Sequence, residues 1–535
     1  MQGSDTTTTV GFFSFAAAQP ERLAIIEPGS RETTYGELRD RVNQLSHGLR
    51  QLGLVPGNTI AMVTHNNRTR FEVALATGQI GLYLVPINYH LSSSEIAYIV
   101  TNSEAKAVIV DPQVLATCAA GLDEIQYPLD RRFVIGEVEG WHRYEELWEN
   151  RSTSSPADRT AGETMVYTSG TTGFPKGVRR PLTGGSPEEG SRSTTSFLTL
   201  LGFKPGDVHL VVSPLYHTAP GGFALSTLHL GHTVVIMDKF DAETALQLIE
   251  RYRVANTHMV PTMFYRMLQL PEEVRLRFDV SSLRRVVHAG APCSVEVKRR
   301  MLDWLGMQVY EYYGASEGGV SMITPQEWLA HPGSVGQAFP GVTVIIFDDA
   351  GQELPPNEVG MVYFRPSMGD FEYYKDPVKT AAARRGDLVT VGDMGYLDED
   401  GWLYLSDRRT DMILSGGVNI YPAEIEARLM EHPAVADVGV IGVPDEEWGQ
   451  RVIAFVQPHA GLTPSEELAR ELIAWCRAGI ATYKAPRAIE FRTELPRNAA
   501  GKMQRRTLRD QYGELRPWGE KPARVAANKP DEQAR

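Results

Sequence analysis

Cysteine is scarce in this chain, whose 535 residues include only three, Cys118, Cys293 and Cys476. Their positions are far apart and show no CxxC or zinc-finger spacing, so neither a disulfide framework nor a structural zinc site is expected, and a reducing cytoplasm fits best. An excess of positive charge is also missing, since the formal net charge is -13. Because nonspecific binding to nucleic acid needs clustered cations, we expect no nucleic-acid partner.

Long apolar runs are missing as well. Residues 10–18 are apolar, but this stretch is far too short to span a bilayer, and no basic region precedes it. We therefore expect neither a transmembrane segment nor secretion, while peripheral contact with a membrane stays open. The content of 42% hydrophobic and 22% charged residues is ordinary for a soluble protein, and 535 residues exceed what one core usually supports.

Short β-branched segments alternate with longer amphipathic ones in the first part of the chain. This pattern predicts an α/β fold in which largely parallel sheets are covered by helices. The strands are expected at 59–63, 83–87, 107–110, 209–213, 233–237 and 285–288, and the helices at 35–52 and 242–252. After about residue 333, strands separated by turns predict a β-rich subdomain that closes this large domain.

A second, smaller domain of α+β type is predicted near the C-terminus. Its helices are expected at 422–431 and 464–478, and its strands at 435–443 and 453–457. The expected limits are 1–408 for the large N-terminal domain and 409–515 for the small one. Residues 516–535 are rich in Pro, Lys, Glu and Ala and are expected to form a disordered tail.

Segment 167–178 combines several hydroxyls with three glycines and one lysine, directly after an apolar run. Glycines bring backbone N–H groups close to an anion, while hydroxyls and an ammonium group add donors and charge, so this loop is suited to hold phosphate. The pattern of a P-loop NTPase fails, because Pro175 precedes Lys176 and Gly177 follows it. A flexible polar surface loop is the plain alternative.

Four further segments accompany this loop along the chain. They are Pro214-Leu215-Tyr216-His217, Tyr312-Tyr313-Gly314-Ala315-Ser316-Glu317, Gly392-Asp393 with Asp407-Arg408, and Pro496-Arg497-Asn498-Ala499-Ala500-Gly501-Lys502. With the loop, they make the chain similar to the adenylate-forming superfamily, which holds acyl-CoA synthetases, luciferases and peptide-synthetase adenylation domains. The resemblance covers about residues 10–512 and is closest to acyl-CoA synthetases of the fatty-acid–CoA ligase type.

The resemblance implies an ATP- and Mg²⁺-dependent enzyme in which a carboxylate attacks the α-phosphate of ATP and pyrophosphate departs. Such chemistry depends mainly on positioning and charge neutralisation. The family's phosphate-binding role falls on Thr168, Ser169, Gly170, Thr171, Thr172, Gly173 and Lys176. Glu317 corresponds to the Mg²⁺ ligand, and Ser316 stands where the family usually has a threonine whose hydroxyl contacts the α-phosphate.

The same resemblance implies the nucleoside contacts. Tyr313 corresponds to the residue that stacks on adenine, and Asp393 to the carboxylate that binds both ribose hydroxyls. Arg408 corresponds to an arginine that supports ribose and phosphate. The base would be bordered by Gly290, Ala291 and Pro292. Taken alone, Tyr-Tyr-Gly is better explained as a buried strand end followed by a turn.

A mobile C-terminal domain is implied too, because relatives rotate it between adenylation and thioester formation. Lys502 corresponds to the lysine that reaches the substrate carboxylate and the α-phosphate in the first step, although Ala500 replaces the usual threonine. The pivot falls on Thr410, where relatives more often carry Asp or Lys. The segment with Gly416 and Gly417 resembles the pantetheine tunnel for coenzyme A (CoA), the co-substrate. Weaker candidates for the CoA nucleotide are Trp448, Tyr483, Lys484 and Arg487.

His217 resembles the aromatic gate between the acyl pocket and the CoA tunnel. Acid–base catalysis by this histidine is not required, because the carboxylate and the thiol can be activated electrostatically. Segment 219–225 should begin a helix that lines the acyl pocket, and its small residues leave space. This favours a medium- or long-chain fatty acid or a bulky ring, such as a sterol side-chain acid, over acetate.

The leading hypothesis is therefore an AMP-forming acyl-CoA ligase for a hydrophobic carboxylic acid. One alternative is an adenylating enzyme that passes acyl-AMP to a carrier protein or to oxygen, but no carrier domain follows. Another is a catalytically silent nucleotide-binding homologue, against which the retention of Glu317, Asp393, Arg408 and Lys502 argues. The particular acid and the oligomeric state stay open.

Overall fold

The computed structural model describes residues 11–168, 175–366, 369–408, 411–415, 418–445, 448–480, 482–498, 501–512 and 518–519. The chain divides into two compact units. The first contains the residues up to Leu405 together with Ala499–Lys502, and the second contains Ser406–Asn498 and the residues from Met503 onward.

A parallel sheet of six strands, in the order β7-β6-β5-β3-β4-β8, lies in the first unit. Its strands are β3 (Thr59–Val63), β4 (Tyr83–Ile87), β5 (Ala105–Val110), β6 (Arg132–Val134), β7 (His142–Arg143) and β8 (Glu163–Thr164). Strands β3 and β4 are buried along their whole length. This explains why their sequences are continuous apolar runs, as in parallel sheets with both faces covered.

A nine-stranded sheet in the same unit has the order β17-β16-β15-β14-β13-β11-β12-β1-β2. Its strands are β1 (Leu23–Ile26), β2 (Glu32–Thr34), β11 (Val208–Val211), β12 (Thr233–Ile236), β13 (Asn256–Met259), β14 (Arg285–His288), β15 (Val309–Ala315), β16 (Gly318–Ile323) and β17 (Gln337–Ala338). Six of these strands run parallel to one another: β1, β12, β11, β13, β14 and β15. The strands β2, β16 and β17 are antiparallel to the strands beside them. Since parallel strands share one carboxyl-end edge, the segments that follow β11, β13, β14 and β15 meet there.

Two smaller sheets complete the first unit, although the last three residues of strand β24 (Leu403–Arg408) belong to the second unit. One has the order β20-β10-β9, with β9 (Val166–Thr168), β10 (Lys176–Arg179) and β20 (Glu372–Tyr373). The other contains β18 (Val344–Phe347), β19 (Gly360–Phe364), β21 (Arg384–Arg385), β22 (Leu388–Val389), β23 (Asp393–Leu397) and β24 (Leu403–Arg408). This second sheet confirms the β-rich subdomain that was predicted beyond residue 333.

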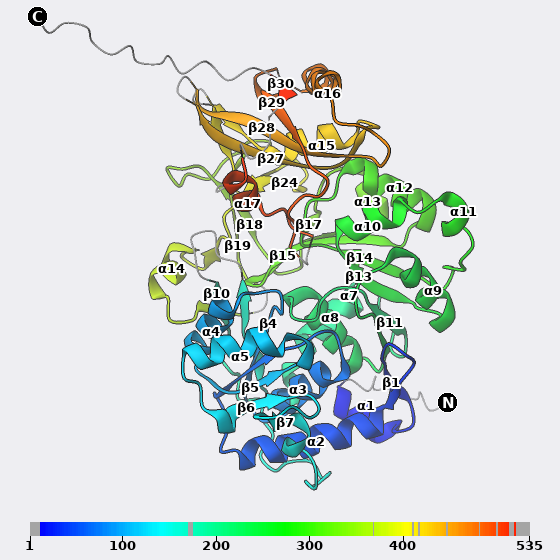
Figure 1. The fold of residues 1–535 in the computed structure, drawn as a ribbon, viewed down its shortest axis with the longest axis vertical. Coiled ribbons are helices and arrows are strands. Elements are labelled where there is room, and N and C mark those ends of the chain that lie inside the picture. Colours follow the sequence, from blue (N-terminus) through cyan, green and yellow to red (C-terminus); the bar gives the residue numbers. More distant parts are fainter. Residues whose placement is uncertain are drawn as a thin grey trace, which may run out of the picture. The chain divides into compact units, whose positions relative to one another are not determined.

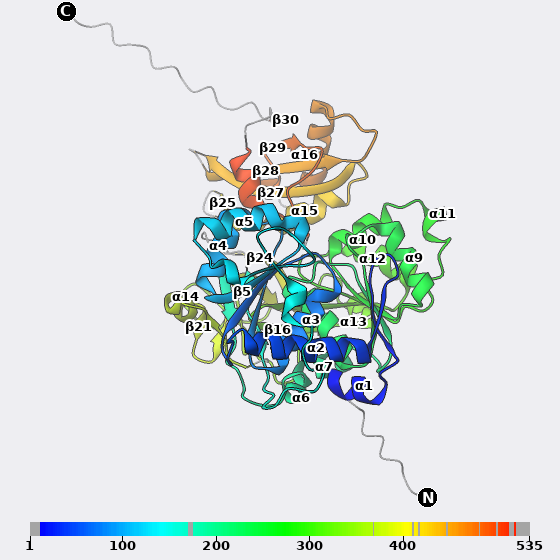
Figure 2. The same ribbon diagram turned by 60° about the horizontal axis from the view of Figure 1, so that its bottom comes forward.

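Helices surround the two large sheets of the first unit (Figures 1 and 2). They are α1 (Phe12–Ala18), α2 (Tyr35–Gln51), α3 (Arg68–Gln79), α4 (Ser93–Asn102), α5 (Leu115–Glu124), α6 (Pro187–Gly190), α7 (Arg192–Leu200), α8 (Thr218–His229), α9 (Ala242–Tyr252), α10 (Pro261–Leu268), α11 (Glu272–Arg275), α12 (Val295–Leu305), α13 (Pro325–Ala330) and α14 (Pro377–Ala382). Helix α2 begins at a capping box, in which Thr34 and Glu37 satisfy each other's backbone N–H groups.

The core of the first unit lies on both faces of the nine-stranded sheet. Adjacent residues of β11 point to opposite faces, and Val211 joins a cluster with Leu38 of α2, Phe71 of α3 and Ile60 of β3. Leu210 joins the other cluster, to which α9, α10 and α12 contribute. Almost every residue of α3 is buried, because this helix packs in the core cluster that the two large sheets share.

The second unit is a small α+β fold. Its sheet has the order β27-β28-β29-β30, with β27 (Val435–Asp445), β28 (Gly449–Pro458), β29 (Ala488–Phe491) and β30 (Trp518–Gly519), and a separate hairpin pairs β25 (Ile413–Ser415) with β26 (Val418–Ile420). Its helices are α15 (Pro422–Met430), α16 (Glu466–Gly479) and α17 (Arg505–Asp510). Ile425 of α15 and Leu472 of α16 pack against Val440 and Val456 of the sheet.

The structure confirms the α/β class and most of the predicted elements, with two differences. Strand β24 continues through Arg408, although the charges there were expected to end the strand. The expectation of a tail without structure from residue 516 is wrong for Trp518 and Gly519, which pair with β29 because that strand offers an open edge. Within the part of the chain that the structure describes, no helix is long and apolar enough to cross a membrane.

Candidate active site

Glu317 lies in the turn between β15 and β16, at the carboxyl-end edge of the nine-stranded sheet. It is 6% exposed, and its Oε1 accepts a hydrogen bond from the Tyr373 hydroxyl at 2.7 Å. The backbone carbonyls of Ser316 and Glu317 accept hydrogen bonds from Arg180 Nη2 at 2.8 and 3.0 Å. Burial lowers the pKa of the Arg180 guanidinium, while the charges of Glu163 and Glu317 oppose this shift. Two segments distant in sequence therefore fix the position of this carboxylate.

The two ends of the phosphate loop lie opposite each other, because Thr168 in β9 pairs with Lys176 in β10. The other predicted donors lie outside the described residues: Ser169, Gly170, Thr171, Thr172 and Gly173. Lys176 Nζ lies 4.5 Å from the centre of the Tyr373 ring, which is a cation–π distance. Tyr373 thus contacts both the end of the loop and the carboxylate of Glu317.

The predicted nucleoside contacts come together around Tyr313. This residue lies in β15, and its hydroxyl donates to Asp393 Oδ2 at 2.6 Å. Both residues are 9% exposed, and Asp393 follows Gly392, whose φ of 85° suits a glycine. Gly290 begins the predicted base-bordering turn 290–292 after β14, the parallel neighbour of β15, so this turn lies at the same edge of the sheet.

A buried ion pair supports the neighbouring ends of β14 and β15. Lys298 of α12 is fully buried and pairs with Glu311 of β15, while His288 Nε2 at the end of β14 lies 3.5 Å from Glu311 Oε2. Burial raises the pKa of Glu311, and Lys298 opposes that shift. Burial lowers the pKa of His288 well below its usual value, so this imidazole is neutral at pH 7. The cluster positions the strands that carry Tyr313 and Gly290.

His217 precedes helix α8, which begins one residue before the predicted helix. Burial, with a smaller effect of His90, lowers the pKa of His217 to about 4. The imidazole is therefore neutral at pH 7, and the buried Nε2 has no hydrogen-bond partner among the described residues. The next residue, Thr218, shares a hydrogen bond of 2.6 Å between its Oγ1 and Ser316 Oγ. The start of α8 is thus joined to the turn that holds Ser316 and Glu317.

The two glycines of α8 differ in their surroundings. A Cβ on Gly221 would lie 2.5 Å from the carbonyl oxygen of Leu215, so a glycine is needed there for close packing. A Cβ on Gly222 would have no atom within 4 Å. The next residue, Phe223, is buried, with its ring centre 5.8 Å from that of Tyr312. Of the two glycines, only Gly222, which is exposed, has open space beside its Cα.

The second unit carries the predicted CoA residues. Trp448 is 44% exposed, and the Arg487 guanidinium carbon lies 5.6 Å from the centre of its ring. Lys484 Nζ instead donates to both carboxylate oxygens of Glu424 at 2.8 and 2.7 Å. Tyr483 is 51% exposed. The structure therefore brings Trp448 and Arg487 together at the surface, while Lys484 belongs to an ion pair with α15.

The structure describes several other predicted residues only in part or not at all. Gly416, Gly417 and the pivot Thr410 lie outside the described residues. Arg408 is the last residue of β24, but the structure does not describe its side chain. Lys502 is partly exposed. The described residues contain no group of three or more His, Cys, Asp or Glu side chains that could hold a metal ion.

Comparison with known families agrees with this geometry. The sequence profile of the AMP-binding enzyme family matches residues 12–369, and that of the AMP-binding enzyme C-terminal domain matches residues 424–502. The chain belongs to the AMP-binding enzyme family. This AMP-binding enzyme is an ATP-dependent, adenylate-forming acid–thiol ligase, as the resemblance implied.

Similar AMP-binding enzymes cover nearly the whole chain. A fatty acid–[acyl-carrier-protein] ligase, ScoC from Streptomyces coeruleorubidus, is 32% identical over 97% of this chain and 98% of its own length. A 2-succinylbenzoate–CoA ligase from Geobacillus kaustophilus is 33% identical over 92% of this chain and 95% of its own. The solved anthranilate CoA ligase AuaEII, in complex with anthranoyl-AMP, has a TM-score of 0.84 at 26% identity and covers 95% of this chain and 98% of its own. Their acids differ, so this comparison leaves the acid open.

Sequence reasoning missed the side chains that hold the turn of Ser316 and Glu317 in this AMP-binding enzyme. Tyr373 lies 56 positions from Glu317 and belongs to no recognised motif. Arg180 lies 136 positions before Ser316, and its only signal is its place just after the phosphate loop. Thr218 follows the predicted gate and was not singled out. Such contacts depend on tertiary packing, which one sequence does not display.

Proposed function

We propose that the chain activates a hydrophobic carboxylic acid with ATP and Mg²⁺ and transfers the acyl group to CoA. A carboxylate oxygen attacks the α-phosphorus, which forms acyl-AMP and releases pyrophosphate. The CoA thiolate then attacks the acyl carbon and displaces AMP. The observation that carries this proposal is the convergence of Tyr373 and Arg180 on the turn of Ser316 and Glu317. This scaffold holds a hydroxyl and a carboxylate in fixed positions, as electrostatic catalysis requires.

The residues at this turn fit a Mg²⁺ ion. The Glu317 carboxylate is buried, and since the hydrogen bond from Tyr373 goes to Oε1, the carboxylate could hold the ion through Oε2. Mg²⁺ in nucleotide sites is commonly held by one or two carboxylates together with substrate phosphates and water. When bound, the ion would neutralise phosphate charge, while Ser316 would contribute its hydroxyl to the α-phosphate.

The remaining roles follow the geometry of the first unit. Tyr313 would stack on adenine while its hydroxyl orients Asp393 toward the ribose hydroxyls. The neutral imidazole of His217 would gate the acyl pocket, and Lys502 would neutralise charge on the carboxylate and the α-phosphate. For the second step we propose a rotation about Thr410, with the large domain ending at Arg408.

CoA is favoured as acceptor by Trp448, whose exposed ring lies beside the cationic Arg487. Such a pair suits an adenine ring and a phosphate. A hydrophobic acid is favoured by the apolar surroundings of α8, where Phe223 packs near Tyr312 and Gly222 leaves space. A carrier protein is the second candidate acceptor. ScoC, which is similar to 97% of this chain, is a fatty acid–[acyl-carrier-protein] ligase.

Two assays test this proposal. Pyrophosphate exchange with a panel of fatty, aryl and sterol side-chain acids should show exchange that depends on a hydrophobic acid. No exchange with any acid would contradict adenylation. The release of AMP should then depend on added CoA. Release that requires an acyl carrier protein and ignores CoA would favour the second candidate.

A further inference from the structure

Both ends of the loop that presents Lys502 are fastened within the second unit. A backbone bridge pairs Arg497 with Met503. The backbone N–H of Gln504 donates to the carbonyl of Pro496 at 2.8 Å. These contacts hold the two stems of the loop side by side, one on each side of Lys502.

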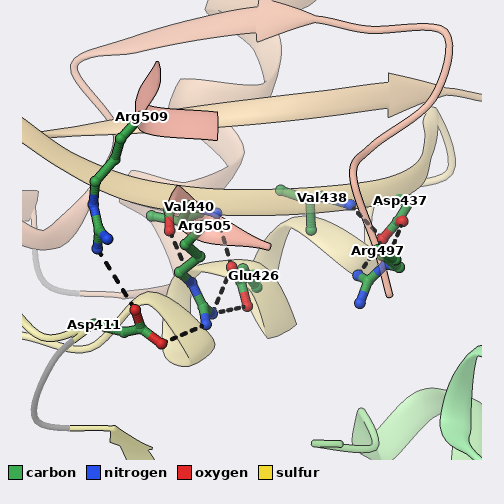
Figure 3. Close-up of polar contacts among 8 residues, drawn as sticks. All are labelled: Asp411, Glu426, Asp437, Val438, Val440, Arg497, Arg505 and Arg509. Carbon is green, nitrogen blue, oxygen red and sulfur yellow. Dashed lines mark hydrogen bonds and ion pairs between the residues drawn. The ribbon is translucent and has the colours of Figure 1, made fainter. Parts of the chain in front are cut away.

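Arg497 fastens the first stem to strand β27. Its Nε and Nη2 donate to Asp437 Oδ2 and Oδ1 at 2.8 and 2.7 Å, in a bidentate ion pair (Figure 3). Asp437 Oδ1 also accepts the backbone N–H of Val438 at 2.8 Å. The carboxylate is therefore fixed to the strand, and the paired geometry fixes the direction of the guanidinium.

Arg505 fastens the second stem to three other segments (Figure 3). Its Nη2 donates to Glu426 Oε1 and Oε2 at 2.9 and 2.8 Å, and its Nε donates to the Val440 carbonyl at 3.1 Å. Its Nη1 donates to Asp411 Oδ2 at 3.3 Å. The Arg505 side chain is 10% exposed, and Glu426 Oε1 also accepts the Val440 N–H at 2.8 Å. Arg505 thus joins α17, α15, β27 and Asp411, the residue after the predicted pivot Thr410.

We propose that Arg497 and Arg505 are positioning residues for Lys502. A lysine side chain is long and flexible, so it delivers its charge to a fixed point only if its backbone is held. The two arginines hold that backbone on both sides. Through Asp411, Arg505 also ties the segment after the predicted pivot Thr410 to the loop. This inference rests on the proposed role of Lys502 in adenylation.

Arg497→Met and Arg505→Met, measured in the full-length enzyme, test the inference. We expect the rate of adenylation, measured by pyrophosphate exchange, to fall by about tenfold to about a hundredfold. Small misplacements of a catalytic group lower rates by factors of this order. Thioester formation from synthetic acyl-AMP and CoA should change far less, since that step does not use Lys502. Arg497→Lys keeps the charge but loses the bidentate geometry, so it should restore only part of the adenylation rate.

Arg428 provides a matched control in the same unit. Its Nε and Nη2 donate to the Trp475 carbonyl at 3.2 and 3.1 Å, and it pairs with Glu431; neither partner belongs to the Lys502 loop. Arg428→Met should lower the unfolding midpoint about as much as the test variants do, without changing the ratio of the two half-reactions. If Arg497→Met and Arg505→Met lower both half-reactions equally, as a loss of folded protein would, the inference is overturned.

A double-mutant cycle separates this inference from the proposed function. If the arginines act through Lys502, adding Arg497→Met to Lys502→Ala should cause little further loss of adenylation. Losses that multiply would overturn the positioning role while leaving the role of Lys502 intact. If Lys502→Ala alone leaves adenylation unchanged, the proposed role of Lys502 fails, and the inference fails with it.

Discussion

The hydroxyl of Tyr313 offers a sharp test of the nucleoside site. Tyr313→Phe removes only the O–H that donates to Asp393 Oδ2 at 2.6 Å and keeps the ring that would stack on adenine. Both residues are 9% exposed, so little solvent is available to replace the lost donor. Asp393 would keep its charge and lose the contact that fixes its orientation toward the ribose.

The size of the effect follows from that contact. A hydrogen bond to a charged group contributes about 1.5 to 3 kcal/mol, which corresponds to about tenfold to about a hundredfold in an equilibrium constant. The ribose contact is made in the ground state and in the transition state, so its loss should raise KM for ATP and leave kcat nearly unchanged. Steady-state kinetics with varied ATP at saturating acid and CoA measure both constants.

Tyr312 is the matched control, because it precedes Tyr313 in the same strand and its hydroxyl bonds to His258 Nε2 at 3.2 Å instead. Tyr312→Phe should leave KM for ATP unchanged. An unchanged KM for ATP in Tyr313→Phe, or an equal rise in both variants, would refute the assignment of the Tyr313 and Asp393 pair to the nucleoside.

Four further outcomes are expected. Glu317→Gln removes a metal-ligand charge and should lower Mg²⁺-dependent adenylation by about 10² to 10³; unmodified activity across a Mg²⁺ titration would show that Glu317 is not the ligand. Arg180→Met should raise the Mg²⁺ concentration needed for half-maximal exchange, because it frees the carbonyls of Ser316 and Glu317, and an unchanged titration would count against this support. Thr410→Pro fixes φ near about -65° and should impair the CoA step far more than adenylation, whereas wild-type rates in both would contradict a pivot there. Burial lowers the pKa of His209 from 6.5 to about 4, so between these pH values only the unfolded chain takes up this proton. The free energy of unfolding should therefore decrease as the pH falls through this range, and it should decrease less steeply in His209→Gln. Denaturant titrations at several pH values measure this difference.

The sequence predicted the elements whose patterns are local. Strand β14 and helix α9 have the predicted bounds, because an apolar β-branched run and a periodic amphipathic run each specify their own structure. The pairing of Trp518 with β29 was not predicted, because a polar tail gives no sign of a distant strand edge. Composition alone therefore gave no indication of this two-residue pairing.

In the candidate site, too, the sequence predicted what local motifs specify and missed what distant contacts specify. Residues in recognised motifs, such as Glu317 and Asp393, were found from the sequence, although their roles stay proposals. The side chains that hold them, such as Tyr373 and Arg180, were not found, because each acts across a distance in sequence that only the folded sheets close. The fully buried Lys298 was missed for another reason, since an isolated lysine in an amphipathic helix is usually exposed.

The hydrogen bond between Thr218 and Ser316 has a consequence for redesign of the enzyme. The first turn of α8 is hydrogen-bonded to the turn of Ser316 and Glu317, so a substitution there, made to admit another acid, should also disturb that turn. Gly221 is equally unsuitable, because any side chain would meet the Leu215 carbonyl. Gly222 faces open space. Libraries that aim to change the acid should therefore begin at Gly222 and extend toward the C-terminal half of the helix.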